Sequence, residues 1–493
     1  MSLLYLLLFC AAGFGLMRFF LSGQLRPSLH NALLVSAGAG VGLGIASCLY
    51  FVCLASLGPK IPVLAAVEGI FVIAAVALGL RAKVRNLELS PAPGARIPRY
   101  LIVLVGAAAL LGLVLFVTHS ANKPHGEWDA WAIWNLRARF LYRSGELWKN
   151  AFSAQLSWSH PDYPLLLPGL VALCWTLSSE STLVPIAIAF LFTFATAGLL
   201  ISALAVLRGR AQALIAGALL LATVEFVEVG AMQYADVPLS FYILATIVLL
   251  CLQDRYPDNA RFSILAGLTA GFAAWTKNEG LLFVIAVVLA RAVALIRFRS
   301  VPRLVRQAGS VAAGLVFPLA VVALFKLRFA PPNDLASARP ADMIAHASNV
   351  GRWIAVLQGF GKEALFFGQM AVEGELVRGF LIPIALVLLL YWFLIRFRVE
   401  ERDRSAVATA ALTVGLMLAG DFLVYLLLPN DVGWQMSTSL DRIFLQLWPA
   451  GLFAFFMAAN APELVAKAAG EKSKPARKPA KAQRRVAETR PAR

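Results

Sequence analysis

Long apolar segments separated by short polar ones dominate this chain of 493 residues. A helix needs about twenty mostly apolar residues to cross a bilayer. Thirteen segments have spanning character: 2–21, 30–57, 62–80, 100–118, 182–206, 212–229, 237–252, 262–276, 280–296, 308–329, 377–395, 405–428 and 442–459. A further apolar run, Pro164 to Leu177, is short for a crossing, and we expect it to lie at the outer surface or to dip back into the membrane.

This pattern predicts an all-α polytopic membrane protein with about thirteen transmembrane helices. Its first large outer loop, 119–181, is expected to contain amphipathic surface helices. The composition agrees, because 60% of the residues are hydrophobic and only 14% are charged, with a mean hydropathy of +0.75. A soluble domain is nearer half apolar and about a quarter charged. An ordinary soluble domain is therefore excluded.

Four parts follow from the spacing of apolar and polar segments. Residues 1–99 are expected to form N-terminal transmembrane helices, and 100–300 a core that includes the loop 119–181. Residues 301–460 supply further transmembrane helices and an outer loop, 330–376. The last part, 461–493, is rich in Ala, Pro, Lys and Arg without periodicity, which predicts a disordered basic tail.

The positive charges set the expected orientation, because Lys and Arg concentrate in cytoplasmic loops. With thirteen spans and an outer N-terminus, the basic loops and the tail all lie in the cytoplasm, and the loops 119–181 and 330–376 lie outside. The net charge of +17 is owed in large part to the tail, which favours contact with anionic lipid over nucleic acid. We expect a multi-pass protein of the plasma (bacterial inner) membrane with an extracytoplasmic active site.

The loop 119–181 holds the first candidate chemistry. Glu127 and Asp129 lie among tryptophans, Trp128 and Trp131 included. Acids beside indoles at a bilayer surface suggest a polar ligand with an apolar tail, and a partly desolvated carboxylate would suit a general base. The alternative is an interfacial amphipathic helix with a solvated acid.

A second segment of the loop reads SHPDYPLLLPG and contains His160, Asp162 and Tyr163. Its prolines favour an extended entry into the apolar run that follows. Asp162 could cap that helix, and His160 could be a ligand, an acid or a turn residue. Structural and substrate-binding roles both remain open here.

Further charged residues lie where predicted spans meet the outer face. Asp236 opens one span and is either a helix cap or a functional acid. Lys277 could hold a phosphate as a point charge, or it could pair with Glu279. Arg442 opens the last predicted span and could bind phosphate with its fork of donors, or anchor the helix at the interface.

The order of these motifs resembles the GT-C membrane glycosyltransferases, in the branch of the protein O-mannosyltransferases and the aminoarabinose–lipid A transferases (glycosyltransferase family 39). The resemblance covers roughly residues 100–300. It implies that the first-loop catalytic acid is Asp129, with Glu127 as the less favoured choice, and that Asp236 is the second acidic position. It also implies that Thr276–Lys277 is the turn associated with the donor phosphate, and that His160–Pro168 is the proline-rich segment.

Such enzymes take a sugar from a polyprenyl-phosphate donor at the outer face, so the resemblance implies transfer to an acceptor hydroxyl with inversion. The acceptor could be a lipid, a glycan or a protein, and the sugar would lie over the tryptophans. The sequence indicates no certain cofactor and leaves a divalent metal ion open. The alternatives are a transporter or flippase of a sugar-lipid, and a non-catalytic binder. Transporters tend to place polar residues at mid-bilayer and to have repeated halves, and neither feature is evident here.

Overall fold

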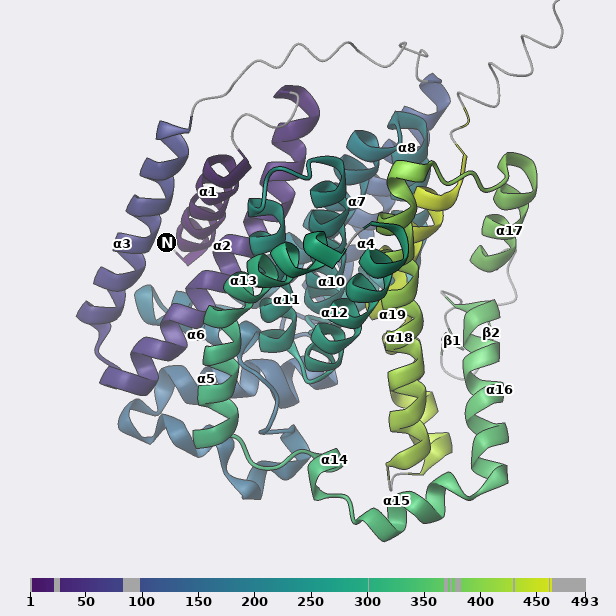
Figure 1. Ribbon diagram of the computed structural model, residues 1–493. Helices are drawn as coiled ribbons and strands as arrows, with labels where there is room; N and C mark the ends of the chain where they lie inside the picture. Colours follow the sequence, from purple (N-terminus) through teal and green to yellow (C-terminus); the bar gives the residue numbers. More distant parts are fainter. Residues whose placement is uncertain are drawn as a thin grey trace, which may run out of the picture.

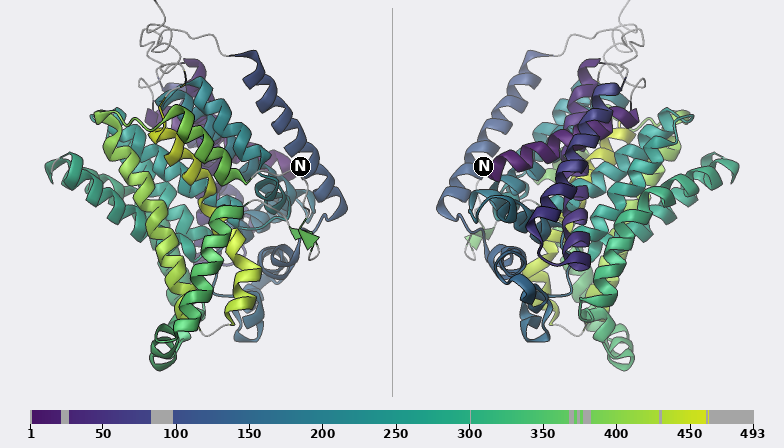
Figure 2. Two further views of the ribbon diagram at one scale, coloured as in Figure 1. Left: turned by 90° about the vertical axis from the view of Figure 1, so that its right-hand side faces the viewer. Right: turned by 90° about the vertical axis from the view of Figure 1, so that its left-hand side faces the viewer.

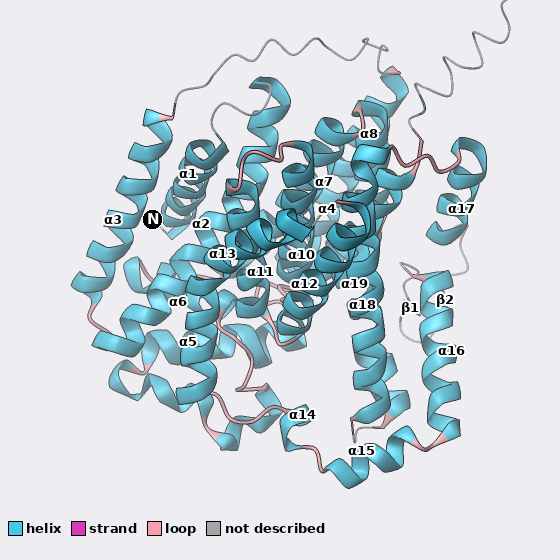
Figure 3. Cartoon of the chain, viewed as in Figure 1, coloured by secondary structure: helices cyan, strands magenta, loops and turns pink. Residues whose placement is uncertain are grey.

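The computed structural model describes residues 2–21, 27–82, 98–299, 301–367, 371–372, 375–376, 383–428, 431–460 and 462 (Figure 1). Helices make up nearly all of this part of the chain (Figure 3). Two strands of two residues, Ala371–Val372 (β1) and Glu375–Leu376 (β2), form the one small sheet among the described residues. The predicted basic tail 461–493 lies outside the described residues apart from residue 462.

Ten helices of the described chain are long and apolar enough to cross a membrane. They are α1 (Ser2–Leu21), α2 (Pro27–Leu57), α3 (Ile61–Arg81), α4 (Arg99–Asn122), α7 (Leu183–Leu207), α10 (Asp236–Arg255), α12 (Glu279–Phe298), α13 (Val301–Arg328), α18 (Arg404–Leu427) and α19 (Val432–Ala458). The chain is thus an all-α protein of the multi-pass membrane type.

Three of the thirteen predicted spans differ. The segment 212–229 is two helices, α8 (Arg210–Ala222) and α9 (Val224–Ala231), with a bend of 60° between them. Helix α11 (Arg261–Thr276) has 16 residues, a length of about 24 Å, which is short of a typical bilayer core. In the described part of 377–395, α17 (Ile384–Ile395) has 12 residues.

The last span also begins earlier than the sequence indicates. Helix α19 starts at Val432, so Asp441 and Arg442 lie inside it and do not open it. Asp431 caps the helix by accepting a hydrogen bond of 2.8 Å from the Trp434 amide. From their polar character, residues 429–441 are expected to form a turn before the last span, but from residue 432 onward they are helical.

Helix α10 is the centre of the bundle. Its apolar window is completely buried, and it packs against α7, α11, α18 and α19. Figure 1 shows α10 among the other helices of the bundle. The helix is enclosed on all sides, so its charged ends must be satisfied by neighbouring helices.

Small residues, including the run GAGVGLG of α2, allow α1 and α2 to touch through their backbones. A Cβ added at Gly13 would lie 1.9 Å from the Gly38 carbonyl oxygen, and one at Gly42 would lie 1.9 Å from the Phe9 carbonyl oxygen. Glycine at these positions is required by the close approach of the two helices.

The loop 119–181 folds against one end of the bundle, which we call the loop end (Figure 1). It contains a π-helical turn at Ala130–Trp134 (η1), α5 (Asn135–Arg143), two 3₁₀ helices, η2 (Gly145–Phe152) and η3 (Ala154–Ser159), and α6 (Leu166–Leu177). The run Leu166–Trp175 of α6 is buried against α2, α5 and α7. This helix is therefore enclosed by protein, as the re-entrant alternative requires, and does not lie on the surface.

The first part of the segment 330–376 also lies at the loop end (Figure 1). It forms α14 (Asp334–Ser337), α15 (Pro340–Ala347) and α16 (Val350–Phe366). Helix α16 runs back along the bundle beside α18 and α19 (Figures 1 and 2). The 3₁₀ turn Glu401–Asp403 (η4) precedes α18 at the opposite end.

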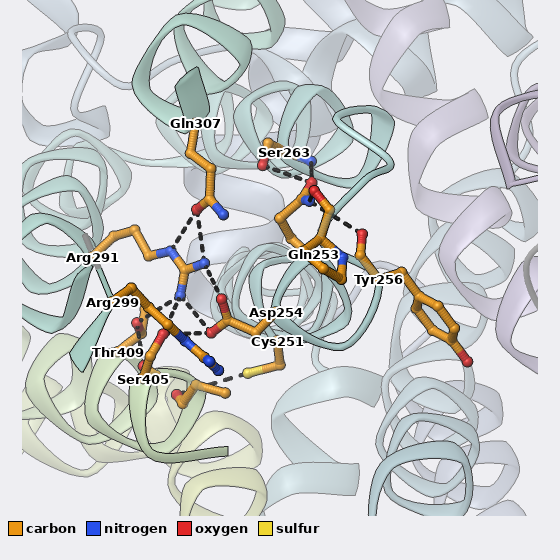
Figure 4. Close-up of polar contacts among 12 residues, drawn as sticks. Cys251, Gln253, Asp254, Tyr256, Ser263, Arg291, Arg299, Gln307, Ser405 and Thr409 are labelled. Atoms are coloured by element: carbon orange, nitrogen blue, oxygen red, sulfur yellow. Dashed lines mark hydrogen bonds and ion pairs between the residues drawn. The ribbon is translucent and has the colours of Figure 1, made fainter. Parts of the chain in front are cut away.

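A buried polar cluster joins four helices at that opposite end (Figure 4). The Arg291 guanidinium of α12 donates two bonds to Asp254 at the end of α10, of 2.9 and 2.7 Å. Its other bonds go to Gln307 of α13 and to Ser405 and Thr409 of α18. The side chains of Arg291 and Asp254 are almost fully buried. Their ion pair and the other hydrogen bonds of Arg291 hold the four helices together.

Candidate active site

Five charged side chains that are far apart in sequence meet at the loop end, where α10 begins. Asp129 comes from the start of the π-helical turn, Asp236 from the first turn of α10 and Arg442 from α19. Lys277 and Glu279 flank the tight turn between α11 and α12. Ion pairs connect all five, and we call them the loop-end cluster.

Arg442 links the loop to the helix core. Its Nη2 atom donates to the Asp129 Oδ2 atom at 2.6 Å and to the Asp236 Oδ2 atom at 2.9 Å. The guanidinium also lies over the Tyr234 ring, 4.7 Å from the centroid. Asp129 and Arg442 keep 14% and 15% of their side chains exposed, so this edge of the cluster is open to solvent.

Asp236 is the inner anchor of the cluster. Its side chain is 0% exposed. It accepts hydrogen bonds from Lys277 Nζ at 3.1 Å, from Gln446 Nε2 at 2.6 Å and from Arg442. Ala235 and not Asp236 occupies the N-cap position, and no side chain caps α10. The carboxylate is therefore committed to the cluster and not to helix capping.

Lys277 joins Asp236 to Glu279, whose Oε1 atom lies 2.8 Å from the ammonium. Burial alone lowers the pKa of Lys277, but the charges of Asp236 and Glu279 outweigh it and hold the pKa above its ordinary value. The second carboxylate oxygen of Glu279 is buried and has no hydrogen-bond partner in the described chain. The cluster holds three carboxylates against two cations, so one negative charge and one acceptor remain unmatched.

Asp162 lies in a second, adjoining network. Its carboxylate accepts a hydrogen bond of 2.6 Å from Asn278, the residue between Lys277 and Glu279. Lys326 of α13 donates to the Asp162 carbonyl and to the Asn278 side chain, at 2.6 and 2.7 Å. Asp162 does not cap α6, whose N-cap residue is Leu165. The network ties the proline-rich segment to the turn that carries the cluster.

His160 and Tyr163 form a stack with Trp134. The His160 and Tyr163 rings lie 4.9 Å apart, and those of Tyr163 and Trp134 lie 5.6 Å apart. His160 has a left-handed backbone, with a φ of 47°, a conformation that costs energy for a non-glycine residue. Arg137 stabilises it by donating hydrogen bonds to the carbonyls of Ser159, His160 and Tyr163. Burial lowers the pKa of Arg137 to about 10.

Glu127 points away from the cluster. Its carboxylate pairs with Lys123 and lies 3.6 Å from the His119 ring. Trp128 and Trp131 pack on each other edge to face, with 57% and 42% of their area exposed. Asp129 is thus held by Arg442 and does not lie between the indoles.

Several cluster neighbours were missed by sequence reasoning. Gln446 lies four residues after Arg442 on the same face of α19, a spacing that could have revealed it. Lys326 resembles an ordinary interfacial anchor at a helix end, and Arg137 looks like one of several loop arginines. Nothing in the sequence distinguishes Tyr234, in the turn before α10, as a neighbour of the cluster.

Within the described residues, no group of three or more His, Cys, Asp or Glu side chains is arranged to hold a metal ion. Comparison of the chain with protein-family models, with curated proteins and with solved structures gave no match.

Proposed function

We propose that the chain is a membrane glycosyltransferase that moves a sugar from a polyprenyl-phosphate donor to an acceptor hydroxyl, with its active site on the extracytoplasmic face. The observation that supports this most is the loop-end cluster. In this cluster the Arg442 guanidinium pairs both with the partly exposed carboxylate of Asp129 and with the buried carboxylate of Asp236. The site thereby combines a candidate base with two cations.

Asp129 acts as the general base in this proposal. It is exposed enough to reach an acceptor hydroxyl, and Arg442 holds it in position. A base that removes the proton as the hydroxyl attacks the anomeric carbon supports a single displacement with inversion. Asp236, fully enclosed and bonded by three side chains, positions Arg442 and Lys277 and does not itself meet the acceptor.

Lys277 and Arg442 stabilise the charge that develops on the departing polyprenyl phosphate. Each cation now faces a carboxylate, so the phosphate would take over donors that Asp129 and Glu279 hold in the structure. Exchange of one anion for another leaves the cations paired throughout. The displaced carboxylates of Asp129 and Glu279 are both partly exposed, so water can solvate them.

One observation favours the alternative, a transporter or flippase of a sugar-lipid. Glu68 of α3 and Asp421 of α18 are buried within candidate spans, and each has a carboxylate oxygen without a partner in the described chain. Ionisable groups inside a membrane often mark a transport path. Asp236, Lys277 and Glu279, however, lie at the ends of helices or in the turn between them, which supports the enzyme.

The test is release of sugar from a panel of radiolabelled polyprenyl-phosphate sugars by the purified protein in nanodiscs. Asp129→Asn is expected to lower turnover by about 10²–10⁴-fold, the usual contribution of a general base, while donor binding persists. Asp342→Asn, an exposed acid of α15, is the matched control and should retain full turnover.

Glu127→Gln separates the two first-loop acids. Full turnover in this variant supports Asp129 as the base, whereas loss in Glu127→Gln with turnover preserved in Asp129→Asn would transfer the role to Glu127. Donor movement between leaflets without any sugar release, abolished by Asp421→Asn, would replace the enzyme with the transporter.

A further inference from the structure

A second polar site lies at the loop end, apart from the cluster. It is a hollow of about 540 Å³ between η2, the end of α2 and the end of α13. Lys149 and Arg328 line it together with two neutral polar residues, Asn150 and Ser153. Among the residues that the structure describes, no acidic side chain lines the hollow, so its chemistry is that of an anion site.

The two cations lack anionic partners in the described part of the chain. Neither Lys149 nor Arg328 has a carboxylate within 4.0 Å there. Lys149 lies over the Trp148 ring, 5.8 Å from its centroid. This contrasts with Lys277 and Arg442, whose charges are already matched by carboxylates. The hollow therefore offers positive charge that a ligand can use.

The apolar wall of the hollow is rigid. Phe152 and Phe329 line it, and both rings belong to a larger aromatic group. Phe329 packs on Trp148 at 5.2 Å and Phe152 packs on Phe325 at 5.2 Å. Rings fixed in this way provide a preformed surface beside the cations, which suits a ligand that is charged at one end and apolar at the other.

The position of the hollow at the ends of candidate spans indicates that its ligand is a lipid. Ala55, which also lines it, lies two residues before the end of α2, and Arg328 is the last residue of α13. The ends of transmembrane helices lie at the level of lipid head groups. The hollow thus faces the layer in which phosphates of lipids are concentrated.

We propose that this hollow binds the phosphate-bearing head group of an anionic lipid. Arg328 supplies a planar fork of donors and Lys149 a point charge for the phosphate. Asn150 and Ser153 donate to the remaining head-group oxygens, and Phe152 and Phe329 contact the glycerol and the first acyl carbons. Basic pockets next to transmembrane helices bind anionic lipids in this way. The proposal is independent of the glycosyl-transfer reaction.

Native mass spectrometry of the full-length protein in detergent tests it, with dioleoylphosphatidylglycerol as the probe and dioleoylphosphatidylcholine as the neutral reference. The wild type is expected to bind the anionic lipid in preference to the neutral one. Lys149→Gln/Arg328→Gln should weaken that binding at least about tenfold, since each charge-assisted bond is worth more than a neutral one. Lys149→Arg/Arg328→Lys keeps both charges and should retain most of the affinity.

Arg339→Gln/Lys362→Gln is the matched control, because it removes two exposed cations of the loop 330–376 that do not line the hollow. Its affinity for the anionic lipid should equal that of the wild type. Equal affinity of Lys149→Gln/Arg328→Gln and wild type would overturn the proposal. Full competition by inorganic phosphate at the lipid's own concentration would also overturn it, because the hollow would then be a site for the free ion.

Discussion

The two ends of helix α10 both carry a carboxylate that faces a guanidinium, in opposite surroundings. At the opposite end, Asp254 and Arg291 form a bidentate pair, and Gln307, Ser405 and Thr409 satisfy the remaining donors (Figure 4). At the loop end, Asp236 and Arg442 belong to a group with an excess carboxylate, a Glu279 oxygen that has no partner among the described residues, and an open edge.

This difference indicates that one carboxylate–guanidinium pair has a structural role and the other a functional role. A buried pair with every donor matched has nothing left to offer a ligand, and breaking it is costly because a charge remains in the protein interior. An incompletely matched group with access to solvent can exchange partners. The first arrangement fixes helices, whereas the second is suited to binding and proton transfer.

The largest effect is expected from Arg291→Met. This change leaves Asp254 buried without its counter-ion and should lower the free energy of unfolding by about 3–5 kcal/mol, measured by unfolding in mixed dodecylmaltoside and SDS micelles. Arg297→Met removes an exposed arginine of the same helix and should have little effect. If both variants have the same free energy of unfolding, the pair of Asp254 and Arg291 does not stabilise the fold as its geometry indicates.

A smaller effect is expected from Lys277→Met, about 1–3 kcal/mol, because Asp236 keeps its bonds from Arg442 and Gln446. The raised pKa of Lys277 sets the pH dependence. Its stabilisation is complete below the unfolded pKa and is lost only as the pH rises through the higher folded pKa.

The difference in unfolding free energy between the wild type and Lys277→Met should therefore stay constant from about pH 6 to pH 9. Unfolding measured at several pH values in this range checks it. A difference that shrinks steadily toward pH 9 would show that Lys277 loses its proton early and that the carboxylates around it do not outweigh its burial.

The smallest effect on stability is expected from Asp129→Asn, about 1 kcal/mol. Asp129 lies at the open edge, and Arg442 remains paired with Asp236 after the change. Together with a large loss of turnover, this result would sharpen the contrast between the two ends. A loss of stability as large as that of Arg291→Met would instead make the loop-end cluster a second structural lock.

Sequence reasoning located much of this arrangement, since ten predicted spans coincide with helices of spanning length. Average hydropathy does not detect a break in the backbone. The segment 212–229 therefore appears continuous, although Thr223 leaves the helical conformation and accepts a hydrogen bond from Trp448. The polar residues 432–441 appear to be a turn, but in the structure α16 packs against α19 and the segment is helical.

The same limits apply to the candidate site. Asp129, Asp236, Lys277 and Arg442 are recognisable because charges are rare among apolar segments. Their mutual contacts depend on packing, since Asp129 and Arg442 are 313 residues apart. The bond from Asp129 to Arg442 has no signal in the sequence, so the two acids could not be separated before the structure.

Helix α10 is held by an ion pair at each extremity, about 27 Å apart along its axis. A rotation or a slide by one residue would break both pairs at once, so the helix acts as a fixed strut. Any opening that admits a substrate must then come from the segments around it. The bond between Asp129 and Arg442 lies at the exposed edge, so it is the contact that can exchange while the strut stays in place.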